Sequence, residues 1–98
     1  MNLYMITLSL PEEPTEDFFN LIPEQRKKVN ELMQEGHISN YLLSADRTKL
    51  WVVASAKNPD ELLAMLQTLP IFEYTEFEWH QVAFHNHVSR FIPSFSLN

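Results

Sequence analysis

The residues best suited to proton-transfer chemistry in this 98-residue sequence are one histidine and one glutamate. His85 is the best base available, because an imidazole gains and loses a proton near neutral pH. The alternative for His85 is a structural hydrogen bond at the end of a strand. Glu24 could act as an acid or a base if its helix turned it towards the interior. The alternative for Glu24 is a solvent-exposed ion pair with Lys28, one helical turn further along.

Polar and aromatic side chains on the expected strands are candidates for binding a substrate. Tyr4, Asn40 and Tyr74 could each donate a hydrogen bond to a substrate oxygen, although tyrosines in sheets often serve as core or interface residues. Trp51 and Trp79 could line an apolar ligand pocket or, instead, fill the core of a dimer. We therefore treat these five side chains as the candidate substrate-binding residues.

Two histidines at alternate positions raise the question of a metal site. His85 and His87 would point to one side of a regular strand and could share an ion. A third ligand is needed, and His80 would lie on the opposite face of that strand. We therefore expect neither a metal ion nor another cofactor.

The composition of the chain excludes several classes of function. Thirteen acidic and seven basic residues give a net charge of −6, which argues against binding to nucleic acid. The absence of cysteine excludes disulfides and thiolate chemistry and fits a reducing cytoplasm. The single glycine, Gly36, excludes glycine-rich phosphate loops. Because no apolar run approaches about 18 residues, we expect no membrane span, and the whole chain, 1–98, is expected to form one domain.

The hydrophobic pattern predicts the order strand, helix, strand, strand, helix, strand, with strands at residues 3–10, 37–44, 50–56 and 73–84. This order predicts a ferredoxin-like α+β fold, in which two helices cover one face of a four-stranded antiparallel sheet. In the first helix we expect Thr15 to cap the start, Pro23 to kink or split the middle and Gly36 to end it. The second helix is expected to begin at Asn58 and to end at Pro70.

Both faces of the predicted sheet carry large apolar side chains, whereas the helices can cover only one face. The second face is most simply covered by the same face of another subunit, so we predict a homodimer or a larger homo-oligomer. Residues 91–97 add four more apolar side chains, and we expect the tail at 87–98 to pack on a neighbouring surface, its own or a partner's. They are Phe91, Ile92, Phe95 and Leu97.

Three segments resemble the muconolactone isomerase family. They are the Leu-Pro-Ile-Phe run at 69–72 followed by Tyr74 and an alternating strand, the helix end at 31–36, and the helix start at 58–62. The resemblance covers nearly the whole chain and implies a ferredoxin-like fold whose sheets pair into a dimeric α+β barrel. It also implies an enzyme that shifts a proton within an unsaturated lactone, without a metal or an organic cofactor. In that comparison His85 matches the histidine that follows the family's last strand.

The chain departs from the family's enzyme at three places. Residues 24–28 include three cations where the enzyme is strongly acidic, Asn40 and leucines replace basic and histidine residues, and Asn86 replaces a proline. Two functions therefore stay open. One is an isomerase-like protein that binds a small, partly apolar organic molecule and shifts a proton in a lactone. The other is a non-catalytic module for ligand binding or oligomeric assembly.

Overall fold

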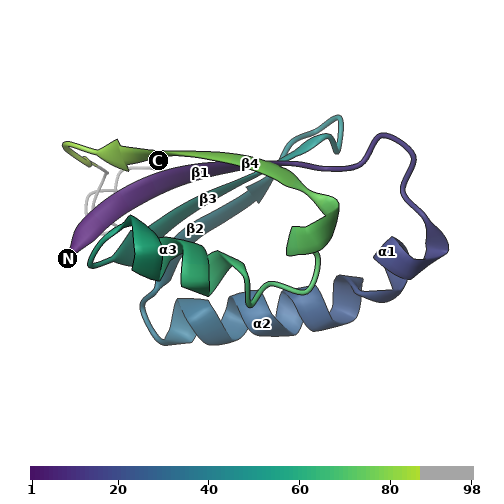
Figure 1. Cartoon of the computed structure of the whole chain (residues 1–98), viewed down its shortest axis with the longest axis horizontal. Helices are drawn as coiled ribbons and strands as arrows, with labels where there is room; N and C mark the ends of the chain where they lie inside the picture. Colours follow the sequence, from purple (N-terminus) through teal and green to yellow (C-terminus); the bar gives the residue numbers. More distant parts are fainter. Residues whose placement is uncertain (87–98) are drawn as a thin grey trace, which may run out of the picture.

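Residues 1–86, which the computed structural model describes, form a four-stranded sheet with helices on one face (Figure 1). The strands lie in the order β2-β3-β1-β4, and every neighbouring pair is antiparallel. This is the ferredoxin-like arrangement predicted from the sequence. The elements in chain order are β1 (Asn2–Ser9), α1 (Glu16–Asn20), α2 (Ile22–Gln34), β2 (Ile38–Leu43), β3 (Lys49–Ala56), α3 (Pro59–Leu66), the short 3-10 helix η1 (Phe72–Tyr74) and β4 (Glu76–Val82).

Local sequence signals set the ends of α1 and α2. The Thr15 hydroxyl accepts a hydrogen bond from the Phe18 N–H at 3.3 Å, which caps α1 as predicted. Pro23 splits the predicted helix in two, and it occupies the first turn of α2, where its missing N–H costs no helical hydrogen bond. Gly36 follows the end of α2 with a φ of +82°, a conformation that glycine adopts without strain.

The start of α3 is as predicted, but its end and both ends of β4 differ from the predictions. Asn58 caps α3 by accepting a hydrogen bond from the Glu61 N–H at 2.9 Å. The helix ends at Leu66, before Pro70 is reached. Strand β4 begins at Glu76 instead of residue 73, because the preceding residues close into the 3-10 turn of η1. It ends at Val82 instead of residue 84.

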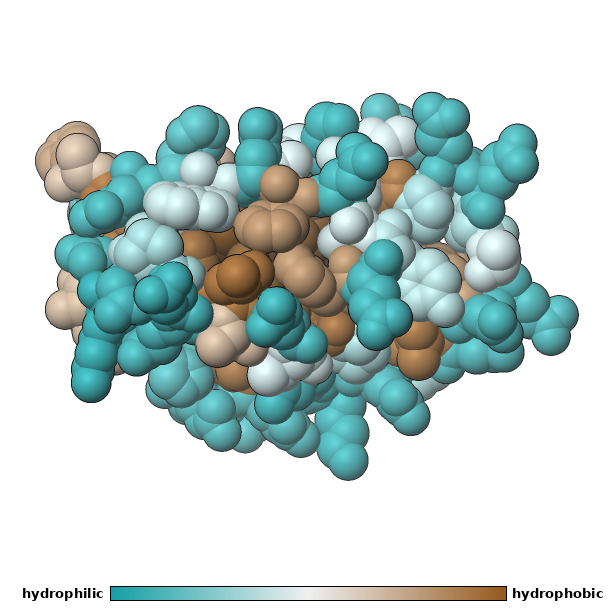
Figure 2. Space-filling model, viewed as in Figure 1, coloured by the Kyte–Doolittle hydropathy of each residue, from teal (hydrophilic) through white to brown (hydrophobic). Residues whose placement is uncertain are grey.

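The helices cover the inner face of the sheet unevenly. Helix α2 packs against β2 and α3 packs against β3, over a core of buried aliphatic side chains from β1 and β3. On β4 the inward-facing Phe77 and Trp79 are each 38% exposed. Figure 2 shows apolar atoms gathered between β4 and the helix layer on this side of the molecule. The β4 side of the interior is therefore the less covered side.

The outer face of the sheet carries a second apolar surface, which we call the open face. Its apolar residues lie on all four strands, and no helix among residues 1–86 covers them. Met5 and Leu42 are 48% and 50% exposed. The apolar side chains of the open face are Leu3, Met5, Leu42, Trp51, Val53 and Val82.

Two sequence predictions fall beyond the described residues. The apolar tail at 87–98 and His87 both lie there, so the packing of the tail stays a prediction. Within residues 1–86, no helix has the length and apolar character needed to cross a lipid bilayer.

Candidate functional site

Tyr4 is the most unusual polar residue of the interior. It lies on the inner face of β1 with no exposed surface, and its hydroxyl has no hydrogen-bond partner in the described structure. Its ring meets that of Trp79 edge to face, with the ring centroids 5.6 Å apart. Buried hydroxyl groups are nearly always hydrogen-bonded, and leaving one unpaired costs about 1–3 kcal/mol. The Tyr4 hydroxyl is therefore a donor without an acceptor among residues 1–86.

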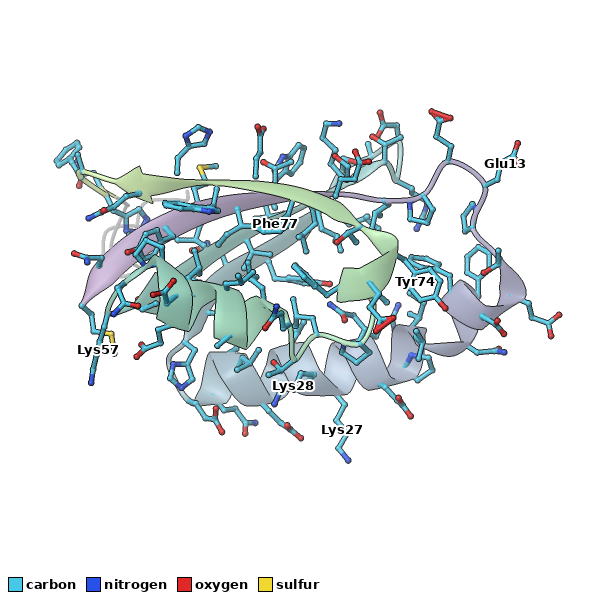
Figure 3. The ribbon with its side chains drawn as sticks, in the orientation of Figure 1. Glu13, Lys27, Lys28, Lys57, Tyr74 and Phe77 are labelled. Carbon is cyan, nitrogen blue, oxygen red and sulfur yellow. The ribbon has the colours of Figure 1, made fainter. Side chains whose placement is uncertain are left out.

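The inner face of β4 adjoins Tyr4 and presents two aromatic rings and an amide. Phe77, Trp79 and Gln81 alternate along the strand on the helix side, and Gln81 is directly opposite Tyr4 in the pairing with β1. Figure 3 places Phe77 between β4 and the helix layer, and the centroid of its ring lies 5.2 Å from that of Phe72. We call Tyr4, Phe77, Trp79 and Gln81 the β4 shelf. It combines apolar surface with one buried donor that has no partner among residues 1–86.

The structure separates Trp51 and Asn40 from this shelf. Both lie on the open face, on the opposite side of the sheet from Trp79. Trp51 is half-buried beside Leu42, and the Asn40 side-chain oxygen accepts a hydrogen bond from the Ser39 hydroxyl at 2.9 Å. The two tryptophans therefore do not line one pocket within a subunit.

His85 and Glu24 lie at opposite ends of the sheet. Strand β4 ends at Val82, which pairs with Leu3 near the start of β1, so His85 follows at the same end of the sheet as Tyr4. Glu24 is exposed in the first turn of α2, at the other end (Figure 1). Its expected partner Lys28 instead approaches Glu31, at 4.0 Å. One subunit therefore does not bring the two predicted catalytic residues together.

Tyr74 also lies at the far end from His85. Its ring packs edge to face against that of Phe18, with the centroids 5.7 Å apart, and it lines a cavity of about 570 Å³ beside Lys49 and Glu76. In the described part of the chain, no three potential metal-ligating side chains lie together. His80 is on the open face, whereas His85 follows the end of β4 and His87 lies outside the described residues, so their predicted placement on opposite faces stays a prediction.

A buried polar link that was not predicted joins α2 to its surroundings. Gln25 is 2% exposed, its side-chain oxygen accepts a hydrogen bond from the Ile71 N–H at 3.2 Å, and its amide nitrogen donates to the Tyr41 hydroxyl at 3.0 Å. Burial raises the pKa of Tyr41, although the bond from Gln25 and the charge of Arg26 oppose this shift. Helical spacing could have revealed Gln25, because it lies one turn before the buried Val29.

Comparisons with known proteins agree with this fold. The sequence model of the muconolactone delta-isomerase family matches residues 3–89. A crystal structure of muconolactone isomerase superposes with a TM-score of 0.71 at 20% identity, over 85% of this chain and 90% of that one. A Nitrosomonas europaea protein described as an antibiotic biosynthesis monooxygenase superposes with a TM-score of 0.52 at 13% identity, over 86% of this chain and all of that one. No curated protein sequence matches the chain. Since the family model spans most of its length, the chain belongs to the muconolactone delta-isomerase family.

Proposed function

We propose that the protein binds a small, partly apolar organic molecule on the β4 shelf. The proposal is carried by the Tyr4 hydroxyl, which is fully buried and has no partner among the described residues. An oxygen of the ligand accepts a hydrogen bond from this hydroxyl, and the apolar part of the ligand lies against Trp79 and Phe77. The ligand thereby compensates the cost of the unpaired donor.

Family membership supports a lactone as the ligand and a proton shift as the reaction. Such a shift requires a base that removes a proton from one carbon and, as its conjugate acid, returns it to another carbon, and a donor that stabilises the negative charge developing on the carbonyl oxygen. We assign the first role to His85 and the second to Tyr4, because both lie at the same end of the sheet. Glu24 has no role in this proposal, since it lies at the other end of its own subunit.

The experiment that tests this proposal is a titration of the full chain with muconolactone and related enol-lactones, followed by calorimetry for binding and by NMR for turnover. Tyr4→Phe is expected to weaken binding roughly tenfold, because it removes one hydrogen bond and keeps the ring. Tyr74→Phe is the matched control, and it should leave affinity unchanged. Equal affinity of Tyr4→Phe and the unmodified protein would overturn the binding site.

His85→Ala separates the enzyme from the non-catalytic alternative. If the proton shift is correct, this variant binds the lactone with little change but no longer converts it. Binding without turnover by the unmodified protein would instead favour the simple binding module.

The open face supports self-association as a second part of the proposal. Its apolar side chains extend over all four strands, and Met5 and Leu42 are about half exposed. Exposed apolar surface of this kind commonly marks an interface. We propose that two subunits pair through their open faces, with Trp51 at the contact.

A further inference from the structure

A small cavity between α2 and the edge strand β2 combines three polar side chains with two apolar ones. It has a volume of about 200 Å³ and is lined by Arg26, Val29, Asn30, Met33 and Tyr41. None of these residues belongs to the β4 shelf. No carboxylate lines the cavity, although the chain as a whole is acidic.

The hydrogen bonds of Gln25 determine the direction in which the Tyr41 hydroxyl can donate. The Ile71 N–H is a donor, so it must meet the side-chain oxygen of Gln25. The amide nitrogen of Gln25 then faces Tyr41 and donates to its oxygen. The Tyr41 hydroxyl is thus the acceptor in this bond, and its own proton has no acceptor within residues 1–86.

The two other polar groups of the cavity are also able to donate. Arg26 makes no ion pair with any residue of the described chain, and a guanidinium is always protonated. Asn30 is exposed and can turn its amide towards the cavity. A phenol is protonated at neutral pH, and burial raises the pKa of Tyr41 further. The cavity therefore presents a cation, a phenol and an amide beside an apolar wall.

We propose that this cavity binds a short-chain carboxylate, with the carboxylate on Arg26 and the Tyr41 hydroxyl and the alkyl part against Val29 and Met33. A planar guanidinium matches a carboxylate through two parallel hydrogen bonds. The apolar wall favours a short alkyl acid over an inorganic anion, which would leave that wall in contact with water. The site lies on the β2 side of the molecule and is independent of the function proposed for the β4 shelf.

Propionate is the probe, and its binding to the full-length protein can be followed by NMR through the side-chain signals of Arg26 and Asn30. The NMR chemical shifts should change saturably with propionate concentration, and propionamide and inorganic phosphate should cause weaker changes. Arg26→Gln should reduce propionate affinity at least about tenfold. Lys27→Gln is the matched control, because Lys27 projects away from the sheet (Figure 3) and does not line the cavity.

Tyr41→Phe should reduce the affinity several-fold and so reports on the second contact. Tyr41→Phe also removes the acceptor of the Gln25 amide and can therefore impair folding. If it does, Arg26→Gln still tests the proposal. Each of three results would overturn the proposal. They are the absence of saturable chemical-shift changes, an equal loss of propionate affinity in Arg26→Gln and Lys27→Gln, and tighter binding of phosphate than of propionate.

Discussion

Replacement of Tyr4 by phenylalanine is expected to stabilise the ligand-free protein. The change removes only the hydroxyl, which is buried and unpaired, and keeps the ring that packs against Trp79. Relief of an unpaired buried hydroxyl is worth about 1–3 kcal/mol. For a domain of this size, each kcal/mol raises the melting temperature by about 4–8 °C.

The assay compares Tyr4→Phe with Tyr41→Phe by urea unfolding and thermal melting without ligand. The two substitutions are chemically identical, but the Tyr41 hydroxyl accepts the hydrogen bond from Gln25. Its removal leaves the amide of a residue that is 2% exposed without a partner, so stability should fall by about 1–3 kcal/mol. The two variants are therefore expected to change stability in opposite directions.

A loss of stability in Tyr4→Phe equal to that in Tyr41→Phe would refute this reasoning. It would mean that the Tyr4 hydroxyl has a hydrogen-bond partner in solution. The donor would then not be available to a ligand, and the main support for the β4 shelf would be lost.

Three further outcomes are expected. Trp51→Glu places a charge on the open face and should shift the mass measured by light scattering from dimer to monomer, whereas Phe19→Glu on α1 should not. Hydrogen bonds from the hydroxyls of the turn between β2 and β3 lower the pKa of Asp46 to about 2. The charged carboxylate therefore stabilises the fold fully at any pH above the pKa that Asp46 has in the unfolded chain, and this stabilisation is lost as pH falls through about 2. The free energy of unfolding should therefore be higher than that of Asp46→Asn at pH 5, and the difference should disappear in acid. Arg47→Gly should raise the free energy of unfolding, measured by urea denaturation, by up to about 1 kcal/mol. The reason is that Arg47 has a φ of +62°, a backbone conformation that favours glycine.

The sequence was sufficient to predict the order of elements because its capping and turn residues act locally. Thr15, Asn58 and Gly36 each form the cap or stop that was predicted for them. Strand sidedness was harder to predict, since both faces of β1 are largely apolar and alternation could not show which one meets the helices. The sequence therefore offered Trp51 and Trp79 as partners, although the sheet separates them.

The candidate site depends on contacts between residues far apart in the chain, which spacing alone does not specify. Tyr4 meets Trp79 only because β1 and β4 are neighbours in the sheet. The partners of Gln25 are similarly remote, and one of them, Ile71, is in the turn that delays the start of β4. The helical spacing of Gln25 could have indicated that such a link was needed, but not which groups would form it.

The two inner-face tyrosines indicate the side from which a ligand can reach the interior. On the β2 side α2 packs on the strand and Gln25 donates a hydrogen bond to the Tyr41 oxygen, so this half of the layer opens only through the small cavity beside Arg26. On the β4 side the rings of Phe77 and Trp79 are 38% exposed, and the Tyr4 hydroxyl behind them has no partner within the described part of the chain. A molecule that pairs with Tyr4 must therefore enter past Phe77 and Trp79, between β4 and α3. Phe77→Trp should accordingly slow ligand association and ligand dissociation alike, because both pass the same barrier, and stopped-flow tryptophan fluorescence can measure the two rates.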